Sequence, residues 1–159
     1  IGDTGFVIQW HIVGMFLPSL FVGKWITNYG HRHIMIIGIG AVAMCIGVSQ
    51  VEQSVATYWV SLVTLGVGWN FLFVSSTSLL ITTYLEAEKY RAQAFNELMV
   101  FGVQAIASLS AGWLLIATNW QAINLMSLPL LGLLLVVICW SGQRLKHLQQ
   151  GYLSPKPHH

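Results

Sequence analysis

Five long apolar runs, separated by short polar connectors, dominate the pattern of this chain. They cover residues 6–26, 34–49, 58–82, 92–117 and 122–141. A helix rises about 1.5 Å per residue, so roughly 20 apolar residues cross the hydrocarbon core of a bilayer. The second run is short and must borrow residues from its flanks. Each run therefore predicts one membrane-spanning segment.

The same runs argue against the other architecture that can cross a bilayer. Backbone amides inside hydrocarbon must be paired within the protein, which leaves helices or a closed barrel. Barrel strands alternate between apolar and polar residues, and no run shows that alternation. The chain is therefore predicted to be an all-α polytopic transmembrane helix bundle over residues 1–142. A polar tail, residues 143–159, follows the bundle.

Composition agrees with a lipid environment. Charged residues make up 8% of the chain and hydrophobic residues 55%, whereas a soluble domain carries about a quarter charged residues. Five runs are also too many for a cleavable signal peptide. The two cysteines, Cys45 and Cys139, lie inside apolar runs and are interpreted as small hydrophobic residues. The first residue is Ile1 rather than methionine, so we expect a fragment of a longer protein.

All lysines and arginines fall at three places along the chain. They flank the first connector, lie in the third, or belong to the tail: Lys24, Arg32, Lys89, Arg91, Arg144, Lys146 and Lys156. With five spans, these three places face one side of the membrane, while Asp3 and Glu52 face the other. Cytoplasmic loops carry an excess of lysine and arginine. We therefore expect the start of the chain outside, and the basic loops and the C-terminus in the cytoplasm.

The first connector also carries a pattern of glycines. Residues 21–33 read FVGKWITNYGHRH, with Gly23 near the end of a span, Gly30 in a predicted tight turn and Arg32 just beyond it. This stretch resembles the cytoplasmic loop of major facilitator superfamily transporters, roughly G-x-L-A-D-R-x-G-R-R. Thr27 stands where the family has aspartate, and the basic residue that follows is also replaced.

Three further stretches strengthen the resemblance, because they are similar to the last half of bacterial drug and metabolite carriers of that superfamily: QWHIVGMFLPSLFVG, GVGWNFLFVSSTSLL and RAQAFNELMVFGVQAIASLSAG. The resemblance implies that the spans are the eighth to twelfth of a twelve-helix transporter in the bacterial inner (plasma) membrane. It implies the C-terminal part of a secondary active transporter that moves a small solute by alternating access and is proton-coupled when complete. Such a part would need the missing N-terminal half, or a second copy, and is not expected to transport alone.

Polar side chains inside the spans are the candidates for a solute site. His11 lies in the outer third of the first span, with Met15 and Pro18 on about the same helical face. An ionisable group at membrane depth is costly and usually faces a cavity or a partner. Imidazole groups also exchange protons near neutral pH. The alternatives for His11 are a cavity residue, a proton carrier and a neutral histidine bonded to a neighbouring helix.

Trp69, Asn70 and Gln104 are the other candidates for substrate binding. Trp69 and Asn70 lie near the middle of the third span, and Gln104 lies in the fourth. Substrate sites of such transporters lie near the bilayer midplane, between the two halves. An amide offers a donor and an acceptor, and an indole offers a face for a ring or a cation. The alternative for each amide is a hydrogen bond between helices.

Glu97 stands about two turns inside the cytoplasmic end of the fourth span. A carboxylate there could bind a proton or a cation. The alternative, which we favour, is an ion pair with a basic residue such as Arg32. Such a pair would hold the cytoplasmic ends together in one transport state and release them in the other.

Small residues in the spans predict close packing of helices. Glycine lets helix backbones approach each other inside a membrane, where apolar side chains gain little by leaving lipid. The glycines expected to act in this way are Gly14, Gly40, Gly47, Gly66 and Gly102.

Other kinds of function find no support in the sequence. His31 and His33 are two residues apart, which is poor geometry for a metal on one helix, and no third ligand is near. Phosphate-binding glycine loops and paired catalytic carboxylates are absent, so we expect no enzymatic activity, no cofactor, no metal and no nucleic-acid partner. The expected partners are the lipid bilayer and a small solute of undetermined identity. The rival hypothesis is a non-transporting membrane sensor or assembly subunit derived from a degenerate half-transporter.

Overall fold

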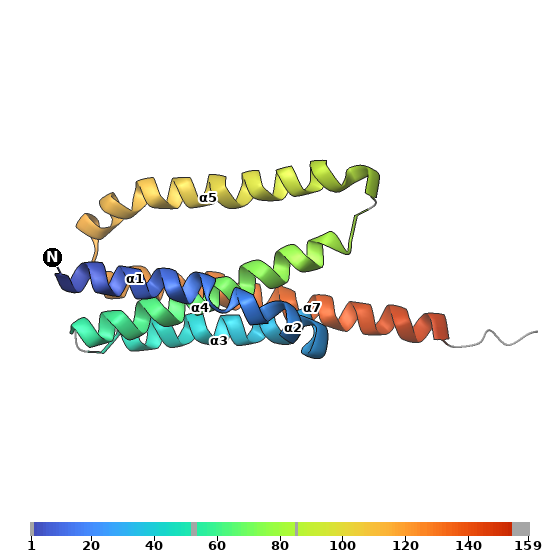
Figure 1. Cartoon of the computed structure of the whole chain (residues 1–159), viewed down its shortest axis with the longest axis horizontal. Helices are drawn as coiled ribbons and strands as arrows, with labels where there is room; N and C mark the ends of the chain where they lie inside the picture. The colour runs from blue at the N-terminus through green and yellow to red at the C-terminus, as the bar shows by residue number, and fades with distance from the viewer. Residues whose placement is uncertain (1, 52–53, 85, 154–159) are drawn as a thin grey trace, which may run out of the picture.

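The structure, a computed structural model, describes residues 2–51, 54–84 and 86–153. Over these residues the chain is built from helices (Figure 1). Its elements in chain order are α1 (Gly2–Phe16), α2 (Ser19–Tyr29), α3 (His31–Ser49), α4 (Val55–Ile81), the 3₁₀ turn η1 (Glu86–Glu88), α5 (Lys89–Ala117), α6 (Trp120–Met126) and α7 (Leu128–Leu153). Glu52 and Lys156, two of the charges used above to orient the chain, lie outside the described residues.

Five helical stretches are long and apolar enough to cross a membrane, namely Gly2–Tyr29, His31–Ser49, Val55–Ile81, Lys89–Ala117 and Trp120–Ser141. α1 and α2 together form the first stretch, and α6 with the start of α7 forms the fifth. The predicted all-α bundle with about five spans is therefore confirmed. α7 continues to Leu153, so the segment predicted as a tail begins as an extension of the last helix.

Local sequence determines where several helices begin. Ser54 precedes α4, and its hydroxyl accepts a hydrogen bond from Thr57 N at 3.2 Å. Asn119 precedes α6, and its Oδ1 accepts from Ala122 N at 2.8 Å. Such caps satisfy backbone donors that have no partner in the first turn. Gly30 alone separates α2 from α3, and its φ of 82° is rarely adopted by L side chains, which confirms the predicted tight turn.

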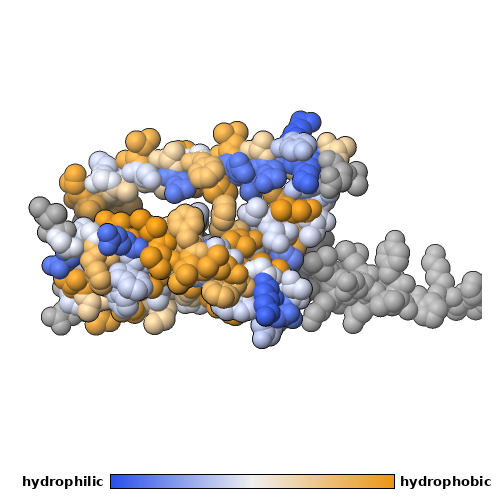
Figure 2. All heavy atoms as spheres, viewed as in Figure 1, coloured by the Kyte–Doolittle hydropathy of each residue, from blue (hydrophilic) through white to orange (hydrophobic). Residues whose placement is uncertain are grey.

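The connections that carry basic residues lie at one end of the bundle. Figure 1 shows the Gly30 turn, the α4–α5 connection and the far end of α7 at one end, and the N-terminus at the other. On the face drawn in Figure 2, apolar side chains cover much of the surface, and hydrophilic ones gather toward the start of α5. Arg32, Lys89 and Arg91, which lie at the helix ends next to these connections, are therefore found at the same end of the bundle.

α4 is the central helix of the bundle, because it packs closely against both α1 and α3. At the crossing with α1, a Cβ on Gly66 would lie 2.6 Å from His11 O, and one on Gly14 would lie 2.9 Å from the α4 backbone. At the crossing with α3, a Cβ on Gly68 would lie 2.9 Å from Gly38 O. Since real Cβ atoms do not approach backbone atoms so closely, both crossings depend on glycine.

These distances decide which of the predicted packing glycines act as expected. The prediction is confirmed for Gly14 and Gly66. For Gly40, Gly47 and Gly102 it stays a prediction, because an added Cβ there would meet no atom of the described residues within 4 Å.

α5 stands apart from this packed core. None of its residues is buried, and its closest contacts are with its sequence neighbours η1 and α6. Figure 1 shows α5 as a separate arm along one side of the bundle, joined to the rest at its two ends. The consequence is a hollow between α5 and the core helices.

Candidate functional site

A cavity of about 690 Å³ lies between α5 and the wall formed by α1 and α4, and the hollow beneath α5 is visible in Figure 2. Its lining consists of His11, Met15, Leu65, Trp69, Met99, Val100, Val103, Gln104 and Ala107. Volumes of about 300–1,000 Å³, apolar walls and a few polar groups are typical of small-molecule sites. Three of the four residues predicted to bind substrate, His11, Trp69 and Gln104, meet here from three helices.

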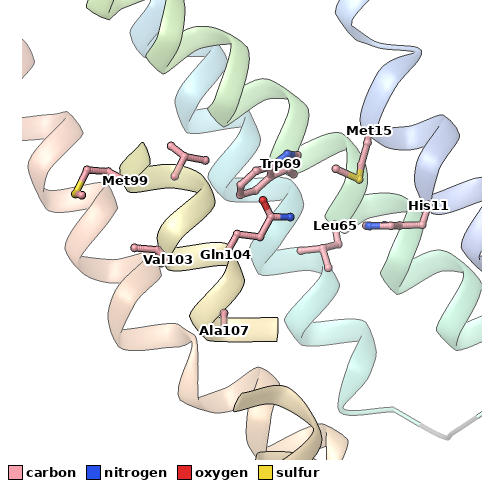
Figure 3. A pocket seen from close by; sticks show the side chains of 9 residues that line it. His11, Met15, Leu65, Trp69, Met99, Val103, Gln104 and Ala107 are labelled. Carbon is pink, nitrogen blue, oxygen red and sulfur yellow. The ribbon is translucent and has the colours of Figure 1, made fainter. Parts of the chain in front are cut away.

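His11 is tied to α4 through its ring. Nδ1 lies 2.6 Å from Leu62 O. A carbonyl oxygen can only accept a hydrogen bond, so Nδ1 carries a proton and donates it. The ring also lines the cavity, and Figure 3 shows it pointing from α1 toward α4. Two of the alternatives drawn from the sequence therefore coexist, since His11 binds a neighbouring helix and lines the cavity.

Trp69 and Gln104 contribute to the cavity from facing helices. The Trp69 ring stacks on Phe73, with centroids 5.9 Å apart and planes 14° apart, which fixes the orientation of the indole. Trp69 remains 38% exposed. In Figure 3, the Gln104 side chain extends from α5 toward Trp69 and Leu65 of α4. An aromatic face and an amide are thus presented to the same space.

Asn70, predicted to bind substrate, does not line the cavity. Its side chain is 4% exposed and is not part of the cavity lining. Its Nδ2 donates to Met15 O at 2.6 Å, which joins α4 to α1. Its Oδ1 is buried and has no hydrogen-bond partner within the described part of the chain. The amide therefore lies behind the cavity wall, as the interhelical alternative has it.

The carbonyl that Asn70 binds is made available by a break in the first span. Pro18 has no N–H for Gly14 O, and its ring interrupts the helix there, so the following N–H groups do not continue the ladder and Leu20 N bonds Leu17 O instead of Phe16 O. Met15 O accepts from Asn70 instead, and Phe16 O accepts from Ser19 Oγ at 2.6 Å. Side chains thus replace missing backbone donors one turn from His11.

The predicted loop motif lies at the opposite end of α2 from Pro18. Gly23 is inside α2, where an added Cβ would meet nothing within 4 Å. Arg32 follows the Gly30 turn in the first turn of α3, and its Nε is buried without a hydrogen-bond partner among the described residues. The neighbouring His31 Nε2 lies 3.1 Å from Ser78 Oγ, which links α3 to α4.

Glu97 is exposed on α5 and lies outside the cavity lining. Within residues 2–51, 54–84 and 86–153, no ion pair joins Glu97 to Arg32, so the structure does not bring these two charges into contact. His33 Nδ1 forms a hydrogen bond with Tyr29 O at 2.6 Å. The same part of the chain contains no cluster of three potential metal ligands.

Nothing in the sequence distinguishes the apolar residues that line the cavity from other apolar residues of the spans. Leu65, Met99 and Val103 are ordinary residues of a membrane span. Their spacing is informative once one cavity residue is known, because Leu65 and Trp69, or Val103 and Ala107, are four residues apart and share a helix face. The Leu62 carbonyl that binds His11 could not be identified in this way, because every residue of a helix has one.

Comparison with known proteins identifies the same family that the sequence resembles. The Major Facilitator Superfamily profile matches residues 2–152. The riboflavin transporter RfnT of Brucella anthropi is 38% identical over 129 residues, which cover 81% of this chain and 32% of that protein.

Two uncharacterized MFS-type transporters of Bacillus subtilis, YdeG and YddS, are each 29% identical, over 91% and 92% of this chain and 34% of their own lengths. The chain thus spans about a third of the length of these relatives. No solved structure was found to match it. The chain belongs to the Major Facilitator Superfamily and is an integral membrane protein of a transporter family.

Proposed function

We propose that this chain is the C-terminal part of a secondary active transporter that moves a small solute by alternating access. The observation that carries the proposal is the cavity, which combines apolar walls with His11, Trp69 and Gln104 inside membrane-spanning helices. The transporter lies in the bacterial inner membrane, with its basic loops and C-terminus in the cytoplasm. The remaining helices, from the N-terminal half of the transporter or a second copy, cover α5 and close the cavity.

The lining favours a flat and uncharged solute. None of the nine lining residues is Asp, Glu, Lys or Arg, so a charged solute would lose its hydration without gaining an ion pair. The Trp69 ring offers a stacking surface, and Gln104 offers both a donor and an acceptor. Riboflavin, the solute named for the relative that is 38% identical, has a flat ring system of this kind. We take a flavin or a similar heteroaromatic compound as the solute.

Proton coupling is assigned to the titratable groups of α1 and α5. Among the lining residues, His11 carries the side chain that can accept a proton, at Nε2 of its ring. Glu97 lies on the same helix as Gln104, toward the end of α5 that holds the basic connector. Protonation at these positions would link solute movement to the proton gradient.

Arg32 and Glu97 form an ion pair in another transport state. In the present arrangement Arg32 Nε is buried without a partner among the described residues, and Glu97 is exposed. A buried donor without a partner costs about 1–3 kcal/mol. Movement of α5 toward α3 would bring the carboxylate to the guanidinium and recover part of that cost.

Uptake of riboflavin into proteoliposomes tests the proposal, using the complete transporter that contains this chain. We expect saturable uptake that increases with an inward proton gradient. Trp69→Ala should lower the affinity about tenfold, since stacking of a heterocycle on an aromatic ring is worth about 1–3 kcal/mol. Trp113→Ala is the matched control, because Trp113 lies on α5 outside the lining and is 71% exposed. Solute binding without any uptake would support the sensor or assembly subunit instead.

A further inference from the structure

His11 is held at the closest approach of two helices. The carbonyl of His11 lies 2.6 Å from the position that a Gly66 Cβ would take, so the backbones of α1 and α4 touch at this point. The ring nitrogen Nδ1 then reaches Leu62 O, 2.6 Å away, one turn from Gly66 on α4. Backbone contact and ring hydrogen bond act on the same residue and restrict the orientation of the imidazole.

This anchoring determines the chemistry of the other ring nitrogen. In a neutral imidazole one nitrogen donates and the other accepts. Because Nδ1 must donate to the Leu62 carbonyl, Nε2 of neutral His11 is an acceptor. Within the part of the chain that the structure describes, no protein group is bonded to Nε2, and it is not one of the buried atoms without a partner. The acceptor is therefore available on a ring that lines the cavity.

The rest of the lining indicates what kind of group would satisfy this acceptor. Met15, Leu65, Met99, Val103 and their apolar neighbours offer no strong hydrogen-bonding groups, whereas Gln104 offers a flexible amide and Trp69 an indole N–H that can only donate. A solute with an N–H next to a carbonyl could donate to Nε2 and accept from, or donate to, the Gln104 amide. A solute edge that carries a carboxylate, or whose nitrogens are all alkylated, has no N–H to donate to Nε2 of His11.

We propose that His11 is a specificity-determining residue that presents a fixed acceptor, Nε2, and selects flat heterocycles carrying an imide or lactam N–H. The inference rests on the proposed transport of such a heterocycle and adds which edge of the solute is recognised and by which atom. It assigns to the Leu62 carbonyl a positioning role, because that carbonyl determines the His11 tautomer.

Two solutes and three variants of the complete transporter test this assignment. The solutes are riboflavin and an analogue methylated at the ring imide nitrogen, which keeps the ring but has lost the N–H. His11→Asn keeps an amide that can donate to Leu62 O in place of Nδ1 but has no group at the Nε2 position. His11→Gln places an amide oxygen near the Nε2 position and weakens the anchor. His11→Phe keeps a ring of similar size and has neither nitrogen.

We expect the unmodified transporter to take up riboflavin about tenfold more efficiently than the methylated analogue, the preference that one hydrogen bond can supply. His11→Asn and His11→Phe should reduce this preference to about twofold or less, while His11→Gln should retain most of it. Equal loss of both solutes in every variant, with the preference unchanged, would overturn the role of Nε2 while leaving transport intact. Preference retained in His11→Phe would assign selection to ring size and would also overturn it. Absence of saturable uptake of either solute by the unmodified transporter would instead reject the proposed function, and the inference with it.

Discussion

α4 and α5 are helices of nearly the same kind in very different surroundings. They contain 27 and 29 residues, and both are apolar enough to cross a membrane. About a third of the residues in the most apolar segment of α4 are buried inside the bundle. None of the residues in the most apolar segment of α5 is buried. Hydropathy alone therefore does not distinguish a central helix from a peripheral one.

The difference lies in small residues that face other small residues. Gly66 and Gly68 of α4 meet Gly14 of α1 and Gly38 of α3, so the backbones can touch. A Cβ on Gly102 of α5 would meet no atom of the described part of the chain within 4 Å. In lipid, apolar side chains gain little by turning inward, so close packing and interhelical hydrogen bonds decide which helices associate. Hydropathy places a helix in the membrane, and matched small surfaces determine its neighbours.

The largest effect is expected from filling the α1–α4 crossing. Gly66→Leu would place its Cβ 2.6 Å from His11 O, and the backbone there cannot move aside as a side chain can. We expect destabilisation of about 3 kcal/mol or more, at the upper end of overpacking effects. Gly102→Leu, the matched change on α5, should not destabilise this chain when it is studied by itself, because no described residue lies within 4 Å of the added Cβ. Thermal unfolding in detergent measures both variants, and equal destabilisation would contradict the contrast between the two helices.

The next effect concerns the polar contact between the same two helices. Asn70→Leu removes the donor to Met15 O and leaves that buried carbonyl unbonded, but it also removes the unpartnered Oδ1, so we expect destabilisation of about 1 kcal/mol. The cost should fall by about half when Pro18→Ala is also present, because a continuous helix supplies backbone donors to the carbonyls of this turn. Chemical unfolding of the two single variants and the double variant gives the coupling energy. Strict additivity would show that the Pro18 break is not what makes Asn70 necessary.

A smaller effect is expected from the charges that would join α5 to the packed core. Reversing one charge, with Arg32→Glu or Glu97→Lys, should lower solute uptake about fivefold, or about 1 kcal/mol, as for a partly exposed ion pair. The variant with both reversals should recover part of the lost uptake, because attraction is restored with the signs exchanged. Uptake assays in vesicles measure all three variants. A double variant as impaired as the sum of the single ones would exclude the pair.

The smallest effect is expected where α4 meets α3 near the Gly30 turn. Ser78→Ala removes the partner of His31 Nε2 and should cost about 0.5 kcal/mol, the average for hydrogen bonds between membrane helices. Ser76→Ala is the control, because Ser76 Oγ donates to Phe73 O of its own helix. The midpoints of thermal unfolding compare the two. A larger loss in Ser76→Ala would show that helix-internal hydroxyl bonds matter more than the interhelical one.

Much of the fold could be predicted because its causes are local. The length of each apolar run indicates a span, and Gly30 predicts a turn because few other residues adopt its conformation. Part of the candidate site could also be predicted from the sequence, since His11, Trp69 and Gln104 are polar or amphipathic groups in otherwise apolar helices.

Contacts between helices could not be predicted from one helix at a time. Gly38 and Gly68 look no different in sequence from Gly40 and Gly47, yet only the first two face another backbone. Asn70 is as polar as Gln104, but the Pro18 break placed a free carbonyl beside it. The packing of these glycines and the hydrogen bond of Asn70 both depend on the surface of the neighbouring helix. The sequence of one helix does not contain that information.

The break at Pro18 also changes how the first span can transmit force. Its first piece, α1, packs against α4 through Gly14 and His11, while its second piece, α2, is joined to α3 by Gly30 alone. A displacement of the Gly30 turn would therefore bend the span at Pro18 before it reached the His11 contact, and it would have to separate Val22 and Ile26 from Phe71 of α4. Because the two contacts lie on opposite sides of the break, we expect bending at Pro18 to strain the α2–α4 contact first and the His11 contact last.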